Sequence, residues 1–128
     1  MRKIEAEMLY AIRHAFDAGP DWGKSGTEVL LRGNGAHVEV YLHGNAIARI
    51  LRGGTMAISL AGYNTQTTRS RLNVLLGAFA KPARYPQGLG VFTERGQAYL
   101  ADADGKRPIT DEGWYIANLG HDQMGGGA

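Results

Sequence analysis

Four short runs of β-type residues between positions 27 and 61 are joined by turns so short that they restrict how the chain can fold. A connection of two or three residues joins only antiparallel neighbours, because a parallel crossover needs about a dozen residues or more. Asparagine and glycine in the connections supply the positive φ angles that tight hairpin turns require. The sequence therefore predicts a four-stranded antiparallel meander. Its strands are Thr27–Arg32, Ala36–His43, Ala46–Arg52 and Thr55–Leu60.

The second of these runs alternates strictly between two kinds of side chain. Such alternation is typical of an antiparallel sheet with one face buried and the other open. The apolar face carries Ala36, Val38, Val40 and Leu42, and the polar face carries His37, Glu39, Tyr41 and His43. We expect a helix to cover the apolar face.

Two longer segments have the helical period. Residues 2–18 repeat apolar side chains every four positions, and Gly19 and Pro20 end the segment. Residues 66–79 form the second helix, and Pro82 ends it because a proline disfavours helical geometry in the residue before it. The first stripe is Ile4, Met8, Ile12 and Phe16, and the second is Leu72, Leu75, Leu76 and Phe79.

The rest of the chain predicts further short strands. A hairpin turns near Arg95 and Gly96, and two more short segments follow it. These segments are Leu89–Glu94, Gln97–Ala101, Arg107–Ile109 and Trp114–Leu119, with Phe92 and Trp114 assigned to the core. We therefore predict an α+β fold in one domain over residues 1–119. Residues 120–128, which include three consecutive glycines, are expected to form a flexible tail.

The composition argues against several kinds of site. The chain has no cysteine, which excludes disulfides and thiolate metal ligands. His37 and His43 share a strand face but lie too far apart for a metal site without closer partners, so we interpret them as surface residues. The sequence has no arrangement of serine, histidine and aspartate that would indicate a catalytic triad. It also has no pair of carboxylates in apolar surroundings, so hydrolase chemistry has little support. We predict no enzymatic activity, no cofactor and no metal. No apolar run approaches the roughly 20 residues of a membrane span, so we expect no membrane partner.

Positive charge is concentrated between Val40 and Thr93. This window contains no aspartate or glutamate, although the whole chain has a net charge of only +2. Its basic residues are Arg49, Arg52, Arg69, Arg71, Lys81 and Arg84. Segregated positive charge attracts polyanions, and a phosphate backbone is therefore the leading ligand hypothesis.

Hydroxyl, amide and guanidinium groups crowd the start of the second helix. Thr67, Thr68 and Arg69 fall in its first turn, where free backbone N–H groups favour anions. Arg69 and Arg71 are predicted to flank the apolar stripe on opposite sides, where they would rim the buried face and fork onto phosphate oxygens. The alternative is an N-capped helix whose arginines bond to nearby carbonyls or carboxylates.

Tyrosines accompany the basic residues. Tyr63 precedes the threonine-rich segment and Tyr85 follows Arg84, and aromatic rings beside cations can stack unpaired bases. Ordinary packing of these rings is the alternative. Arg49 and Arg52 are an odd number of residues apart, so at most one should join the binding surface directly. The candidate nucleic-acid-binding residues are Arg49, Arg52, Tyr63, Thr67, Thr68, Arg69, Arg71, Lys81, Arg84 and Tyr85.

The segment Tyr63-Asn-Thr-Gln-Thr-Thr-Arg-Ser-Arg-Leu-Asn73 resembles a block in small bacteriophage proteins. The likeness covers about residues 27–117 and is greatest to the single-stranded-DNA-binding RNA polymerase cofactor of N4-like bacteriophages. It implies a fold distinct from the OB barrel and a role in binding melted promoters and recruiting the phage polymerase. By this resemblance Tyr63, Thr67, Thr68, Arg69 and Arg71 match positions of the block.

Two functions follow as the main hypotheses, and an enzyme acting on nucleotides is a distant third. The first is a non-enzymatic single-stranded-DNA-binding protein that assists phage transcription in the cytoplasm of the infected host, with the phage RNA polymerase as a partner. The second is a phage interaction module whose basic face docks an acidic host or viral protein. We also predict a homo-oligomer, because exposed strand edges can pair between chains.

Overall fold

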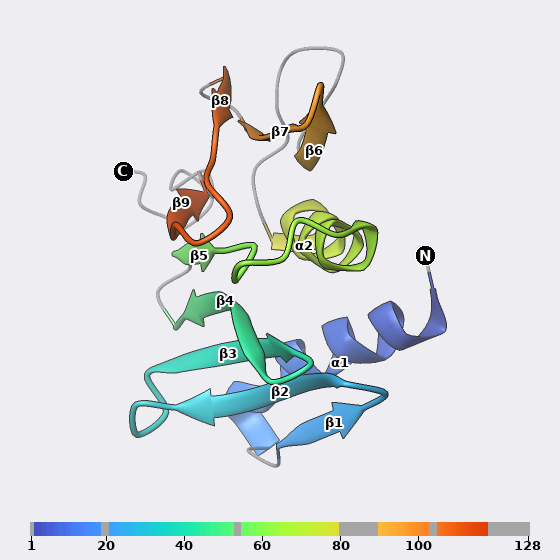
Figure 1. The fold of residues 1–128 in the computed structure, drawn as a ribbon. Helices are drawn as coiled ribbons and strands as arrows, with labels where there is room; N and C mark the ends of the chain where they lie inside the picture. Colours follow the sequence, from blue (N-terminus) through green and yellow to red (C-terminus); the bar gives the residue numbers. More distant parts are fainter. Residues whose placement is uncertain (1, 19–20, 53–54, 80–89, 103–104, 118–128) are drawn as a thin grey trace.

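A computed structural model describes residues 2–18, 21–52, 55–79, 90–102 and 105–117. Within these ranges the chain forms two helices and nine strands, arranged as an α+β fold (Figure 1). The helices are α1 (Lys3–Ala18) and α2 (Gln66–Phe79). The strands are β1 (Trp22–Lys24), β2 (Thr27–Arg32), β3 (His37–Leu42), β4 (Asn45–Leu51), β5 (Met56–Ile58), β6 (Gly90–Glu94), β7 (Gln97–Asp102), β8 (Gly105–Pro108) and β9 (Tyr115–Ala117).

The predicted meander is confirmed. Strands β2 to β5 pair in sequence order, and each pairing is antiparallel. They form the centre of a six-stranded sheet with the order β1-β2-β3-β4-β5-β9, while β6, β7 and β8 form a separate sheet. The described strands close no barrel, because β1 and β9 lie at opposite edges of the larger sheet.

Three hairpins turn on a residue followed by glycine, with positive φ at both positions. These pairs are Ser25–Gly26, His43–Gly44 and Arg95–Gly96. Two positive φ angles give the turn a twist that matches the strands on either side, and glycine adopts such angles without steric cost. The turn at Ser25–Gly26 joins β1 to β2. Strand β1 was missing from the sequence prediction, and this dipeptide is the signal that indicates it.

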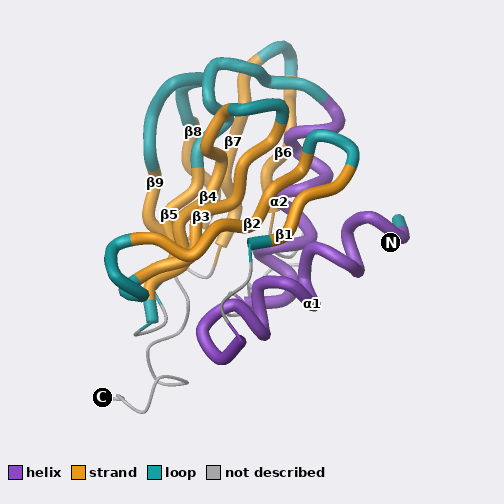
Figure 2. Tube along the Cα trace, turned by 90° about the horizontal axis from the view of Figure 1, so that it is seen from below, coloured by secondary structure: helices purple, strands orange, loops and turns teal. Residues whose placement is uncertain are grey.

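Both helices cover the apolar face of the large sheet. Figure 2 shows them on one side of its strands, where α1 packs on β2 and β3 and α2 packs on β4. The sequence predicted that one helix or the other would do so. The buried core between these layers includes Met8, Ile12, Val38, Val40, Ile50, Leu72, Leu75 and Leu76.

Helix α2 also contacts the small sheet through β6. The Asn73 side chain donates to the Val91 carbonyl at 3.0 Å, and the Val91 N–H donates back to the Asn73 oxygen at 2.6 Å. An amide side chain thus pairs with β6 as a neighbouring strand would. The two C-terminal segments separate, since β8 pairs with β7 while β9 pairs with β5.

The core assignment of two aromatic residues requires correction. Trp114 is 40% exposed and lies on the outer face of the large sheet, with the Arg49 guanidinium 4.7 Å from its ring centre. Phe92 is only partly buried and stacks on Tyr99, with the ring centres 5.6 Å apart. Neither ring belongs to the hydrophobic core or to the partly buried apolar residues packed against it.

Candidate nucleic-acid interface

Arg71 is a buried structural residue. Its side chain is 7% exposed, and Nη1 lies 2.8 Å from a carboxylate oxygen of Glu5, which is 2% exposed. Arg71 Nε also donates to the Thr27 hydroxyl at 3.2 Å, and Ser70 donates to Glu5 at 2.6 Å. The prediction that Arg71 rims the buried face and reaches a phosphate is therefore wrong. Its guanidinium instead joins α2 to α1 and β2.

The orientation of both helices explains this burial. The buried residues of α2 are Thr68, Arg71, Leu72, Leu75 and Leu76, so the inward face includes Arg71. The buried residues of α1 are Glu5, Met8, Leu9, Ile12 and Ala15, whereas Ile4 and Phe16 are only partly buried. A carboxylate at a helical stripe position is the sequence signal for the pair, because a buried acid requires a buried cation.

The Glu5 carboxylate is held in its ionised form. Burial raises the pKa of Glu5, but hydrogen bonds from Ser70, Arg71 and the Arg2 N–H, together with the Arg71 charge, outweigh it and lower the pKa below its usual value. The negative charge of Glu5 is thus already neutralised inside the protein.

The first turn of α2 is capped by its own hydroxyl groups. The Thr65 hydroxyl accepts the Thr68 N–H at 3.2 Å and lies 2.9 Å from the Thr68 hydroxyl. This arrangement makes Thr65 the N-cap. Thr68 is 3% exposed, so its side chain is directed to capping and away from solvent, contrary to the predicted ligand contact.

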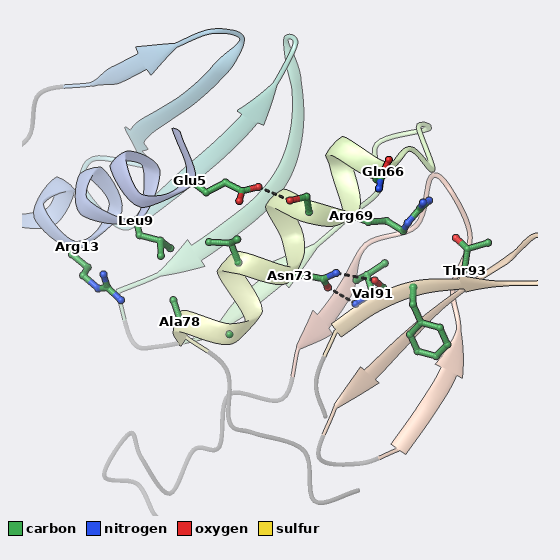
Figure 3. Close-up of a pocket in the computed structure, with 13 residues that line it drawn as sticks. Glu5, Leu9, Arg13, Gln66, Arg69, Asn73, Ala78, Val91 and Thr93 are labelled. Carbon is green, nitrogen blue, oxygen red and sulfur yellow. Dashed lines mark hydrogen bonds between the residues drawn. The ribbon is translucent and has the colours of Figure 1, made fainter. Parts of the chain in front are cut away.

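Arg69 lies at one end of a groove between α1, α2 and β6 (Figure 3). The groove has a volume of about 900 Å³. Arg69 Nη1 donates to the backbone carbonyl of Asn64 at 3.2 Å and to the Asn64 side-chain oxygen. Thr93 also donates to that oxygen, at 3.3 Å. These contacts fix one terminal nitrogen of the Arg69 guanidinium while the residue remains partly exposed.

A second arginine, which the sequence analysis missed, lies at the other end of the groove. The guanidinium of Arg13 on α1 is 5.6 Å from the ring centre of Phe79, the last residue of α2. Figure 3 shows it beside Ala78, far along α2 from Arg69. Arg13 lies outside the acid-free window, and its position one turn after Leu9 is the only sequence signal for it. The other polar and aromatic residues of the groove's described lining include Gln66, Ser70, Asn73, Phe92 and Thr93.

The other predicted arginines lie elsewhere. Arg49 is on the outer sheet face, where it contacts Glu39 at 3.3 Å. Arg52 donates to the Gly35 carbonyl at 3.0 Å and stacks on Phe16 of α1, 4.5 Å from the ring centre. The prediction that they point to opposite faces is confirmed.

Glu39 forms hydrogen bonds and an ion pair with its neighbours in the middle of the outer face. Besides Arg49, it accepts a hydrogen bond from the Tyr41 hydroxyl at 2.8 Å and lies 3.0 Å from His37 Nε2. Burial raises the pKa of Glu39, but these partners outweigh it and lower the pKa overall. The hydrogen bond to Glu39 and burial raise the pKa of Tyr41. The outward orientation predicted for this strand face is confirmed.

Comparison with known proteins places the chain in a family. A family model described as Kyanoviridae Gp96 protein matches residues 1–120. The chain belongs to this family. It is therefore a bacteriophage protein, as the resemblance implied, but the Gp96 match carries no support for the narrower likeness to the polymerase cofactor of N4-like phages. No curated protein and no solved structure matches the chain.

The fold of this Gp96-family chain divides the predicted site. Arg69 lines the groove, whereas Tyr63, Thr67 and Thr68 line a separate pocket. Lys81, Arg84 and Tyr85 fall outside the described residues. Among the residues that the structure describes, no group of three or more histidines and acids could hold a metal ion, and neither helix is long and apolar enough to cross a membrane.

Proposed function

We propose that this Gp96-family protein binds single-stranded nucleic acid, with DNA as the expected polymer, along the groove between α1, α2 and β6. One observation carries the proposal. Arg13 and Arg69 lie at the two ends of the groove, and Glu5, the sole carboxylate among its described lining residues, is already paired with Arg71 and Ser70. The groove is therefore positive where a polyanion would enter and leave.

The spacing of the two arginines suits a strand that runs along the groove. Arg69 lies ten residues before Phe79, against which Arg13 packs. At about 1.5 Å per residue, this separates the two ends by about 15 Å along α2. That distance exceeds the reach of one phosphate, so several nucleotides would lie between the arginines. The Phe92 ring lines the same groove and can stack a base.

The biological role proposed for this binding is assistance to phage transcription in the cytoplasm of the infected cell, with the phage RNA polymerase as partner. It rests on the phage family and on the resemblance of the Tyr63–Asn73 segment. The alternative, a basic face that docks an acidic protein, draws less support from the fold. Arg49 and Arg52 lie on different faces, and Glu28 and Glu39 share the outer face with Arg49.

Fluorescence anisotropy with labelled homopolymer DNA tests the proposal. We expect single-stranded DNA to bind more tightly than a duplex of the same length. The logarithm of affinity should fall with the logarithm of salt concentration by about 0.7 for each phosphate contact, or roughly 1.4 for two. An RNA probe of the same length establishes the preference between the polymers. Equal affinity for the duplex, or no binding at low salt, would contradict the proposal.

We further propose that the protein forms a dimer in which two copies meet through the outer face of the large sheet. Trp114, Ile116 and Leu51 are large, exposed apolar residues of this face. The face also carries both Arg49 and Glu39. In a twofold dimer, Arg49 of one copy can therefore lie opposite Glu39 of the other, so that like charges do not meet. Pairing through the edge of β9 is disfavoured, because Arg107 donates to the Ile116 carbonyl at 2.7 Å.

Light scattering tests this assembly. We expect the wild type to have the mass of a dimer at micromolar concentration and the Trp114→Ser, Ile116→Ser variant to have the mass of a monomer. Tyr10→Ser is the matched control, because Tyr10 is 66% exposed on α1, away from this face. A monomeric wild type, or a double variant that remains dimeric, would refute the proposed interface.

A further inference from the structure

A second cavity lies on the other side of the first turn of α2. It has a volume of about 460 Å³, within the range of about 300–1,000 Å³ found for small-molecule sites. Its deep side is formed by Leu42, Ile47 and Leu60, all buried in the core. Tyr63 and His43 are exposed ring-bearing residues of its lining.

The chemistry of this cavity selects a neutral, flat and partly polar group. Its described lining includes no lysine, arginine, aspartate or glutamate. Apolar side chains and two rings suit the faces of a planar ring system, and the Thr67 hydroxyl and the Asn45 amide can bond with polar atoms at its edge. A nucleobase has this combination of faces and edge.

The cavity and the groove meet at consecutive residues. Tyr63 lines the cavity, and its neighbour Asn64 accepts hydrogen bonds from Arg69 and Thr93 of the groove. Consecutive Cα atoms are about 3.8 Å apart, so a strand leaving the groove at Arg69 arrives beside Tyr63. We propose that this cavity binds one unstacked nucleobase of the strand, with the Tyr63 ring against the base. The inference rests on the proposed function in one respect, namely that the bound base belongs to a single strand held in the groove.

Nucleosides test the cavity without a strand. Thymidine, deoxycytidine, deoxyadenosine and deoxyguanosine would each be titrated into the full-length protein while amide shifts are recorded by NMR. We expect at least one nucleoside to shift the amides of Ile47, Leu60, Tyr63 and Thr67, and deoxyribose 5-phosphate to leave them unchanged. Shifts confined to the groove, or no shifts at millimolar nucleoside, would overturn the proposal.

Oligonucleotide binding by variants gives the second readout. Tyr63 is 56% exposed, so Tyr63→Ala should leave the fold intact. We expect it to weaken single-stranded DNA binding about 5- to 150-fold, the range for loss of one base stack. Tyr63→Phe should retain most of the affinity, because the ring supplies the contact. Tyr10→Ala, which removes an exposed tyrosine from α1, is the matched control and should have no effect.

The outcomes separate this inference from the proposed function. If oligonucleotides bind with an Arg13- and Arg69-dependent salt slope while Tyr63→Ala has no effect and nucleosides cause no shifts, the base site is refuted and the groove stands. If nucleosides shift the cavity amides but no oligonucleotide binds, the groove is refuted while the cavity retains its specificity for bases. A Tyr63→Ala variant that weakens binding no more than Tyr10→Ala does overturns the assignment of the ring.

Discussion

Replacing Arg71 with alanine is expected to lower the free energy of unfolding by about 3–5 kcal/mol, the usual cost of leaving one charge of a buried ion pair without its partner. Glu5, which is 2% exposed in the wild type, would then keep only Ser70 and the Arg2 N–H as described hydrogen-bond partners. Urea denaturation followed by circular dichroism measures the change. In contrast, an arginine that served only a ligand would have little effect on stability.

A double variant provides the control for this prediction. Glu5→Leu combined with Arg71→Met removes both charges and keeps apolar volume between α1, α2 and β2. Replacing a buried pair by apolar residues is often neutral or stabilising. We therefore expect the double variant to be much more stable than Arg71→Ala. An Arg71→Ala protein with wild-type stability would contradict the structural role of the pair.

The same pair predicts how wild-type stability depends on acidity. The pKa of Glu5 is lower in the folded protein than its usual value of 4.5. The ionised carboxylate therefore contributes its full stabilisation above the unfolded-state pKa, and this contribution is lost as the pH falls through the folded-state pKa. Urea titrations at a series of pH values below 4.5 should show this loss, and the Glu5→Leu, Arg71→Met variant should show less of it.

Replacing Arg13 and Arg69 together with alanine is expected to produce the largest loss of single-stranded DNA binding. Each arginine that contacts a phosphate releases counterions from the strand, so the salt slope should become shallower by about 0.7 per lost contact. Two lost contacts would reduce it by roughly 1.4. Anisotropy titrations over a range of salt concentrations measure both the affinity and the slope. Circular dichroism establishes that the double variant remains folded.

Arg49→Ala combined with Arg52→Ala is the matched control. This variant loses the same number of positive charges, but the structure places Arg49 against Trp114 and Arg52 against Phe16, outside the groove. We expect its salt slope to remain close to that of the wild type. Equal effects of the two double variants would mean that net charge alone governs binding and that the groove has no special role.

The local features of the fold were readable from the sequence because neighbouring residues determine them. Short connections restrict β2 to β5 to antiparallel pairing, and Arg95–Gly96 supplies two positive φ angles at a predicted turn. The periods of two and of about 3.6 identified strand faces and both helices. Strand β1 was overlooked although Ser25–Gly26 has the same turn geometry, since a strand of three residues has too little alternation to detect.

The site depended on contacts between distant segments, and the sequence could not fix these. The acid-free window includes Arg69, which lines the groove, but Arg13 lies outside that window and reaches the groove only because α1 packs beside α2. Trp114 became exposed because its segment joins β5 at the sheet edge and not beneath a helix.

Arg69 and Arg71 of α2 show most clearly what the sequence determined and what the tertiary structure determined. The sequence by itself placed Arg69 and Arg71 two residues apart on one helix, on either side of an apolar stripe. Only the tertiary structure decided that Arg71 is buried and that Arg69 lines a groove. The buried carboxylate of Glu5 on α1 pairs with Arg71, whereas Arg69 bonds to Asn64. Desolvating a guanidinium is costly without such a partner, so the packing of α1 against α2 determines which arginine is left for a ligand.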